Sequence, residues 1–548
     1  MVQIQYLSIN NDLQDFASGD FDGGLLNFSV TEMDTLLNNN DSPEYVSFDG
    51  NGIDLQDTSK KFYESGDYAG FVSKGVSDES CKISQYISVW VSDGFDLSQG
   101  LTIKFYGDCC RKIFIQYCNE QTEAIFEEYF DVSSDLYTIK SDTWCSYVRI
   151  YFIETALPNQ FIKISHLKFG SVILLNKFKN IGLLEEINVL SEDLPINALE
   201  CSAVMNEQTE FKENDLLYLY SNNKYYGTFY LDDAERISRN IYSIRASNCI
   251  KKLEESQFNH WDFMSASLNH FLLGDSENAG YSVSELSGVK IVSDDDLSNV
   301  WVYGFVPYKS CRYALCALAY AGCYMVDASR SDKVSLRKIP DKISSVITTK
   351  SKRIIGECTY KKRSPVSKAV LSFPRSYTSE DCEIKCENKS DKWYEVIFPN
   401  PPTYIDETKI IGNRVVGARS LTYMFFQAEE PNLTLKGQNY GLVKGQKTIN
   451  NFPNVINGAE LKFDKFDVVK YIENNGVSTE DKENDIKKYI QSGGTVKAKI
   501  RLRGERVGDL IEIETAFDGM KTGIITSMGI SFGYEDVADI EVLEWQIG

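Results

Sequence analysis

The stretch DLLYLYSNNKYYGTFYL, residues 215–231, indicates the fold class of this chain. It reads as a strand, a polar Ser-Asn-Asn-Lys turn at 221–224 and a return strand, because aliphatic and aromatic residues flank the turn. A third strand, IYSIRA at 241–246, follows the turn at Arg239-Asn240. Short strands joined by tight turns predict an antiparallel meander.

Residues 1–170 are predicted to form an N-terminal β-sandwich. Short runs rich in aromatic and β-branched residues recur there, separated by Asp, Gly, Ser and Asn. The runs are YISVWV at 86–91, LTIKFY at 101–106, IFIQY at 113–117 and YVRIYF at 147–152. The first 40 residues are expected to form, in part, an extended arm.

The remainder is predicted to hold two small β-barrels. The meander lies in the first tube-like barrel, residues 171–255, and strands return in a second β-barrel region, residues 346–548. The latter includes a helix near 478–492, for which Ser478 and Asp481 suggest a capping box. We therefore expect a mainly β chain with an α/β insert and a C-terminal helix.

The insert, residues 256–345, breaks the two-residue period. Its apolar residues at helical spacing are Cys311, Leu315, Leu318, Ala319 and Gly322. Ser310 is a suitable N-cap for this helix. The strand that follows is predicted at 333–337.

Composition excludes several classes of function. The 548 residues carry 57 Lys and Arg against 79 Asp and Glu, a net charge of −22, which disfavours a protein that wraps nucleic acid. The longest apolar run, 313–326, is too short to span a bilayer, so no membrane insertion is expected. No basic, apolar export signal follows Met1. The 13 Cys are accordingly interpreted as mostly buried, reduced thiols.

Two segments of the chain resemble each other. Asp215 is followed by a strand, a turn and Gly227, and Asp509 is followed in the same way by Gly523. One interpretation is a duplicated small barrel. The other is that Asp-Leu followed by alternation is common in β proteins, and the spacing alone leaves both open.

No catalytic, cofactor-binding or metal site is predicted. Cys311, Cys316 and Cys323 lack the spacing of a zinc site and are interpreted as core thiols. His260 and His270 have no nucleophile motif beside them. The acidic run 294–296 lacks the EF-hand pattern and is interpreted as a solvated turn. The chain is therefore expected not to be an enzyme.

Several motifs together resemble the phage tail hub proteins, also called the tail-associated or prophage-endopeptidase tail family. The similar stretches are Gly182–Glu186, Leu194–Asn197, Leu231–Arg236, Pro307–Leu315, Asp327–Val334 and Glu505–Ile511. Their order covers about residues 172–548. The N-terminal module, through 45–50, 70–73 and 162–170, resembles a β-sandwich in tail tips of phages of Gram-positive hosts.

The resemblance implies a virion protein assembled in the host bacterial cytoplasm. It implies a baseplate hub, a homotrimeric ring that joins the tail tube to the tip and lets DNA and the tape-measure protein pass. The implied partners are a distal tail or tube protein ring, the tape-measure protein and tip or fibre proteins, with DNA only in transit. Two barrels in each of three subunits would give a pseudo-sixfold ring.

Two alternatives stay open. Many members of the family add a C-terminal peptidoglycan hydrolase, but here the last predicted strand ends close to Gly548, so a cell-wall hydrolase is the weaker alternative. The other is a carbohydrate-binding receptor protein that acts through the sandwich. Trp90 and Trp144 could stack on a sugar there, although both are expected in the core.

Overall fold

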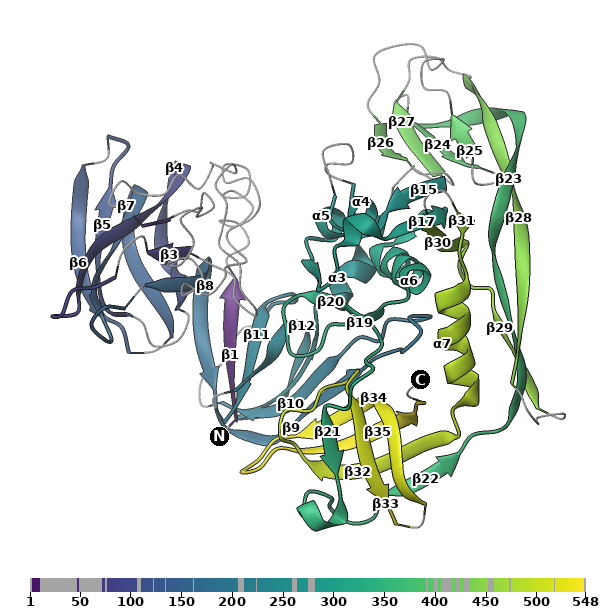
Figure 1. The fold of residues 1–548 in the computed structure, drawn as a ribbon. Helices are drawn as coiled ribbons and strands as arrows, with labels where there is room; N and C mark the ends of the chain where they lie inside the picture. Colours follow the sequence, from purple (N-terminus) through teal and green to yellow (C-terminus); the bar gives the residue numbers. More distant parts are fainter. Residues whose placement is uncertain are drawn as a thin grey trace. The chain divides into compact units, whose positions relative to one another are not determined.

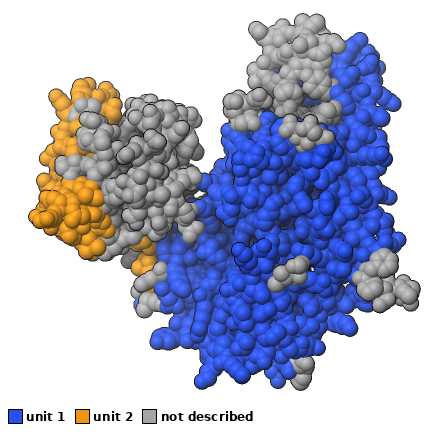
Figure 2. Space-filling view, viewed as in Figure 1, with its two compact units in different colours: residues 1–2, 177–206, 218–548 blue, residues 3–176, 207–217 orange. Residues whose placement is uncertain are grey.

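The computed structural model describes most of the chain. The described residues are 2–9, 47–48, 71–73, 76–105, 110–121, 123–133, 135–160, 162–205, 211–222, 224–258, 264–274, 281–390, 393–398, 403–405, 416–419, 423–427, 433–451, 458–472, 475–516 and 518–546. Two compact units divide them, one of residues 3–176 and 207–217, the other of residues 1–2, 177–206 and 218–548 (Figure 2). Strands dominate both units, which confirms the predicted mainly β class.

The N-terminal unit contains an antiparallel sheet with the strand order β6–β5–β7–β4–β8–β1. Its strands are β1 (Val2–Ile9), β4 (Lys82–Phe105), β5 (Cys110–Cys118), β6 (Ala124–Asp131), β7 (Leu136–Thr155) and β8 (Lys163–Leu175). Alternate residues of the central strands, such as Ile113, Ile115, Ile150 and Phe152, are fully buried in one apolar core. All four sequence runs that predicted strands lie mainly within these elements (Figure 1).

The larger unit contains two sets of antiparallel strands with one common order of pairing. The first set is β9 (Phe178–Glu186), β10 (Ala198–Val204), β13 (Ile241–Ser247) and β12 (Lys224–Ser238), each paired with the next. The second set is β22 (Thr359–Lys362), β32 (Gly494–Arg501), β35 (Val537–Glu544), β34 (Gly519–Ser531) and β33 (Leu510–Thr515). β34 also pairs with β9, so both sets belong to one continuous sheet.

The insert surrounds helix α6 (Cys311–Gly322). The Ser310 hydroxyl accepts a hydrogen bond from the Tyr313 N–H, which confirms the predicted N-cap. Ten of the twelve helical residues are buried, so the helix is enclosed on more than the one predicted face. The short helices α4 (Leu268–Leu272) and α5 (Val283–Ser287) also lie in the insert, and α3 (Ile250–Glu255) directly precedes it. The expected strand follows as β20 (Val334–Arg337).

The second half of the chain contains a long ribbon of two antiparallel strands. β23 (Val366–Ser390) pairs along most of its length with β28 (Leu433–Asn450). At one end it joins β24 (Trp393–Ile397), β27 (Tyr423–Gln427) and a separate apolar core that includes Tyr394 and Phe426.

Helix α7 (Glu480–Gln491) falls within the predicted range 478–492. Its predicted capping box of Ser478 and Asp481 is wrong. Thr479 is the N-cap residue, and its hydroxyl donates to the Glu483 carboxylate. Asp481, in the first turn of the helix, instead forms an ion pair with Lys470 of β30 (Val468–Ile472).

Among the helices that the structure describes, none combines the length and apolar character needed to cross a bilayer. The predicted domains remain predictions, with limits at 1–170, 171–255, 256–345 and 346–548. The N-terminal arm also remains a prediction, because within residues 1–40 the structure describes only β1.

Candidate functional site

The two predicted repeat residues Asp215 and Asp509 occupy the same local turn. One carboxylate oxygen of Asp215 accepts the Lys212 N–H at 3.3 Å, and one of Asp509 accepts the Arg506 N–H at 2.9 Å. In return each Asp N–H donates to the carbonyl three residues earlier, at 3.2 and 3.3 Å. Each Asp therefore closes a turn on itself directly before a buried strand, β11 (Leu216–Ser221) or β33.

The residue before each Asp has left-handed backbone geometry. Asn214 has φ 68° and Gly508 has φ 83°. Asn and Gly are the residue types that adopt this conformation at least cost. Two different residues thus meet one backbone requirement, which a comparison of letters alone does not reveal.

The two copies also share a break in strand pairing. In the β12–β13 pair the register shifts at Asp232, and in the β34–β35 pair it shifts at Thr526. Each shift comes the same number of residues after its Asp, from 215 to 232 and from 509 to 526. A bulge at a matching position bends both strands in the same place.

The predicted glycines lie at different distances from these bulges. Gly227 has φ 132°, and a Cβ atom there would lie 3.6 Å from the Arg330 Cα. Gly523 pairs with Ile511 in β33, and a Cβ atom there would collide with the Leu543 carbonyl. Gly523 therefore allows a close approach of the Leu543 backbone. At Gly227 the nearest neighbour of a Cβ atom would be the Phe229 ring, 3.2 Å away, and it is the positive φ that favours glycine.

The carboxylates of the two turns have different outer partners. Asp215 is 1% exposed and accepts the Tyr6 hydroxyl. Asp509 accepts from Arg337, whose guanidinium also donates to Asp327 at 2.6 Å. Burial works against the charged form of Arg337, but the two carboxylates outweigh it and raise the pKa of that side chain. The second Asp turn is thereby tied to the C-terminal ends of β19 (Met325–Asp327) and β20.

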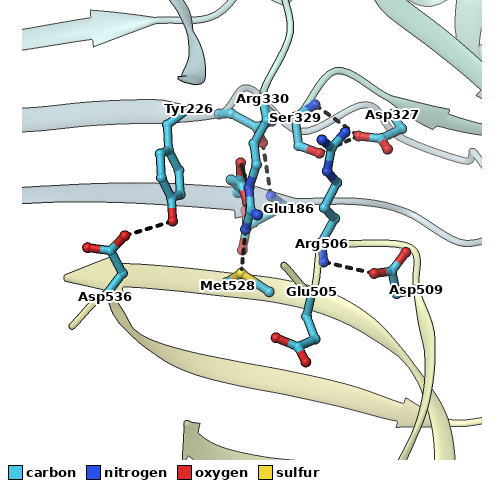
Figure 3. Close-up of polar contacts among 12 residues, drawn as sticks. Glu186, Tyr226, Asp327, Ser329, Arg330, Glu505, Arg506, Asp509, Met528 and Asp536 are labelled. Carbon is cyan, nitrogen blue, oxygen red and sulfur yellow. Dashed lines mark hydrogen bonds and ion pairs between the residues drawn. The ribbon is translucent and has the colours of Figure 1, made fainter. Parts of the chain in front are cut away.

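The loop between β19 and β20 supplies Arg330, the centre of a buried group that we call the Arg330 cluster: Arg330, Glu185, Tyr226, Met528 and Asp536. Figure 3 labels all of its members except Glu185. The guanidinium donates to both Glu185 oxygens at 3.2 to 3.3 Å and contacts the Met528 sulfur at 3.2 Å. It also lies over the Tyr226 ring, 5.0 Å from its centroid. Glu185 and Met528 are directly paired residues of β9 and β34.

The cluster ends at the carboxylate of Asp536, which is 9% exposed. Tyr226 donates to one oxygen at 2.9 Å and Ser221 to the other at 2.8 Å. Burial, together with the hydrogen bond to Asp536, raises the pKa of Tyr226, so the phenol stays protonated as a donor. The side chains of the cluster use their polar atoms to bond to one another. Such an arrangement suits a rigid structural contact better than a catalytic site.

The other sequence candidates do not add a reactive site to the described part of the chain. Cys311, Cys316 and Cys323 are buried, as predicted for core thiols. His270 is buried in α4, and His260 lies outside the described residues. Asp296 caps a single 3₁₀ turn by accepting the Ser298 N–H. Within the described ranges, no group of three or more His, Cys, Asp or Glu side chains is placed to hold a metal ion.

The prediction that Trp144 belongs to the core is wrong, because its side chain is 63% exposed. Trp144 is in β7, where it lies against Gly94 at the register shifts between β7 and β4. The irregular pairing turns the indole out of the alternation that the sequence suggests. The side chain of Trp90 lies outside the described set.

Comparisons with known proteins give structural neighbours only. No family model matches the chain, and no curated protein matches it significantly. Similar solved structures include the 43 kDa tail protein of prophage MuSo2 from Shewanella oneidensis, at 10% identity and a TM-score of 0.40, covering 68% of this chain and 96% of that one. A tail protein from Neisseria meningitidis has 6% identity and a TM-score of 0.41, covering 68% and 94%.

A third similar structure is the prophage tail protein gp18 from Listeria monocytogenes, at 9% identity and a TM-score of 0.38, covering 68% of this chain and 91% of that one. All three of these solved structures are of tail proteins.

Proposed function

We propose that this chain is a structural hub protein of a phage or phage-like tail. In this proposal three copies form a ring that joins the tail tube to the tip and lets DNA and the tape-measure protein pass. A distal tail or tube protein ring and tip or fibre proteins are the neighbours in the assembly. The proposal rests on the order of sequence motifs and on the repeated Asp turn, not on the overlap with solved structures.

The repeated Asp turn is the observation that carries the proposal. One chain contains two strand sets with the same pairing order, the same self-closed Asp turn and the same bulge position. A ring of three such chains presents six similar modules. Six similar modules match the six subunits of a sixfold tube ring that would bind to this trimer.

The Arg330 cluster supports a structural role over an enzymatic one. The cluster lies where β9 of the first strand set meets β34 of the second, and the α6–β20 loop contributes its guanidinium. Buried polar groups that satisfy each other hold elements in one arrangement. A subunit that bears load between a tube and a tip needs such a fixed joint.

The charge of the chain fits the passage of DNA. With a net charge of −22 the protein repels phosphates overall, so a channel built from it would not grip the nucleic acid as it moves. This separates the proposed role from that of a DNA-packaging or DNA-binding protein.

The test is the mass and symmetry of the purified full chain. We expect a trimer by native mass spectrometry at micromolar concentration, and a ring in electron cryo-microscopy with the Asp215 and Asp509 turns at the same radius from the threefold axis. A monomer at that concentration, or the two turns at clearly different radii, would contradict the hub. A peptidoglycan zymogram tests the alternative that the chain is a cell-wall hydrolase, and we expect no cleared band.

A further inference from the structure

The two strand sets of the larger unit form one antiparallel sheet with a free edge at each end. Its strands pair in the order β12–β13–β10–β9–β34–β35–β32–β22. Among the described strands, residues 233–236 of β12 pair only with β13, and β22 pairs only with β32. The outer edges of these two end strands therefore present backbone N–H and C=O groups with which a further strand can pair.

A junction inside the chain shows how two such edges pair. Residues 183–186 of β9, the last strand of the first set, lie opposite residues 527–530 of β34, in antiparallel register. We call this pairing the internal junction. In the second set β22 holds the place of β9, and in the first set β12 holds the place of β34. The same junction between two chains would therefore join β22 of one chain to β12 of the next.

Strand register identifies the residues that correspond in the two sets. Four residues of the first set stand directly opposite one another across β12, β13, β10 and β9: Leu231, Ala246, Leu199 and Leu183. Four residues of the second set do the same across β34, β35, β32 and β22: Ile525, Val542, Val496 and Tyr360. Leu231 and Ile525 each directly precede the matching bulge. Residues 233–236 therefore correspond to 527–530, and residues 360–363 correspond to 183–186.

The register of the internal junction, applied between two chains, brings acidic residues opposite basic ones. Asp233 of one chain would lie opposite Arg363 of its neighbour, and Glu235 opposite Lys361. Cross-strand neighbours of opposite charge stabilise an antiparallel pair. Two copies of a chain with a net charge of −22 repel each other overall, but three consecutive basic residues, 361–363, give the β22 edge the opposite charge to the acidic edge of β12.

The side chains at these positions are available for such contacts. Asp233, Glu235 and Lys361 are exposed, and none of the three forms an ion pair with another described residue. The Arg363 guanidinium donates to the Tyr489 carbonyl at 3.0 Å and has no carboxylate partner among the described residues. A neighbouring chain can therefore supply the missing opposite charges.

Side chains at the corresponding positions meet in the internal junction. The Ser527 hydroxyl donates to the Glu186 carboxylate at 3.4 Å. Ser527 holds the place of Asp233, and Glu186 holds the place of Arg363. An aspartate and a guanidinium at the same two positions are therefore within reach of an ion pair.

We propose that residues 233–236 of one copy pair with residues 360–363 of a neighbouring copy, antiparallel and in the register of the internal junction. Neighbouring strands run in opposite directions along the sheet, so its two end strands also run in opposite directions, as this closing pair requires. The contact uses a different surface on each partner, and its repetition closes a ring when the rotation allows. The number of copies rests on the proposed trimeric hub, whereas the pairing rests on register and charge.

The first experiment is a disulfide cross-link in the full chain. Cβ atoms of directly opposite residues lie about 4.5–5.5 Å apart, close to the span of a disulfide. We expect Glu235→Cys combined with Lys361→Cys to give covalent dimers and trimers on a non-reducing gel after mild oxidation. The matched control combines Glu235→Cys with Lys362→Cys, because successive residues of a strand point to opposite faces. The control should stay monomeric on the gel, and equal cross-linking of both variants would contradict the register.

The second experiment reverses charges at the proposed contact. Glu235→Lys and Lys361→Glu each place like charges opposite one another, and each should raise the dissociation constant of the assembly at least about tenfold in analytical ultracentrifugation. The variant with both substitutions restores opposite charges and should return to within about threefold of the unsubstituted chain. Lys436→Glu is the matched control, because Lys436 is an exposed lysine of β28, outside this sheet. It should change the constant by no more than about twofold.

The results separate this inference from the proposed hub. If the unsubstituted chain is a trimer but Glu235→Cys with Lys361→Cys does not cross-link, the pairing is wrong and the hub is unaffected. Cross-linked chains from a protein that forms no trimer would support the pairing and contradict the hub, and a monomer without cross-links would contradict both. A double charge reversal that associates no better than the single ones would also contradict the pairing. If a charge variant fails to fold, as judged by circular dichroism, the cysteine variants still decide the test.

Discussion

The guanidinium of Arg330 lies 3.2 Å from the carboxylate of Glu185, and these side chains are only 6% and 1% exposed. Burial raises the pKa of Glu185, and the positive charge of Arg330 opposes that rise. Each charge depends on the other, because neither side chain has enough water around it to remain ionised alone. The pair joins the insert to the sheet at the place where β9 and β34 meet.

Removing one partner of this pair should be costly. We expect Glu185→Gln to lower the free energy of unfolding by about 3–5 kcal/mol, because it leaves the buried guanidinium unpaired. The double variant Glu185→Leu with Arg330→Met should recover much of that loss, because it removes both charges. Urea midpoints measured by intrinsic fluorescence give the comparison.

The control for this prediction is Glu186→Gln, at the neighbouring and exposed position of β9. We expect it to change the free energy of unfolding by no more than about 0.5 kcal/mol. Equal losses in Glu185→Gln and Glu186→Gln would show that the buried pair is not the cause.

Substitutions of the left-handed residue in the second Asp turn should differ in how much they lower stability. Gly508 has φ 83°, so Gly508→Ala is expected to cost about 1 kcal/mol, from the Cβ clash in this conformation. Gly508→Asn should cost less, because Asn occupies the matching position 214 with φ 68°. Thermal unfolding followed by circular dichroism gives the order of the three proteins. If Asn is no better tolerated than Ala, the two turns are not equivalent.

Glu505 should contribute stability that depends on pH. Burial works to raise its pKa, but hydrogen bonds from Arg353 and from the Arg503 N–H outweigh burial and lower the pKa. A lowered folded-state pKa means that the stabilisation is present above the unfolded pKa of about 4.3 and is lost as the pH falls through the folded value.

The variant Glu505→Gln isolates this effect. We expect its urea midpoint to lie well below that of the unsubstituted chain at pH 7, and the difference to shrink as the pH falls below about 4.3. Asp539→Asn, which removes the exposed partner of Lys499, should change the free energy of unfolding by about 0.5 kcal/mol or less. A difference between Glu505→Gln and the unsubstituted chain that does not change with pH would contradict the assignment.

The cysteines should react in two groups. Burial raises the pKa of Cys201, Cys311 and Cys316 to about 12, which keeps these thiols protonated and poorly nucleophilic. Among the described cysteines, Cys81 and Cys382 are partly exposed. Pulse labelling of the native chain with iodoacetamide, read by peptide mass spectrometry, should modify these two first. Labelling of Cys311 at the rate of Cys81 would disprove the burial argument, and urea should make all 13 reactive.

The sequence by itself determined what depends on neighbours a few residues apart. Two-residue alternation predicted the β class and many strands, and a hydroxyl before an apolar helical run identified Ser310 as a cap. The similarity of the segments around Asp215 and Asp509 is evident from the amino-acid sequence. The shared turn and bulge were not, because Asn214 and Gly508 satisfy one backbone geometry with different residues.

The tertiary structure decided everything that depends on which distant strands become neighbours. Arg330 meets Glu185 because the loop between β19 and β20 reaches the sheet where β9 pairs with β34, and no local pattern predicts a partner 145 residues away. The same is true of the packed rings of Tyr86, Tyr151, Phe114 and Tyr129, which come from four strands and meet only through the register of those strands. Trp144 differs from expectation for a related reason. Alternation predicts the face of a residue only while pairing stays regular, and irregular register or unusual strand length is set by the partner strand.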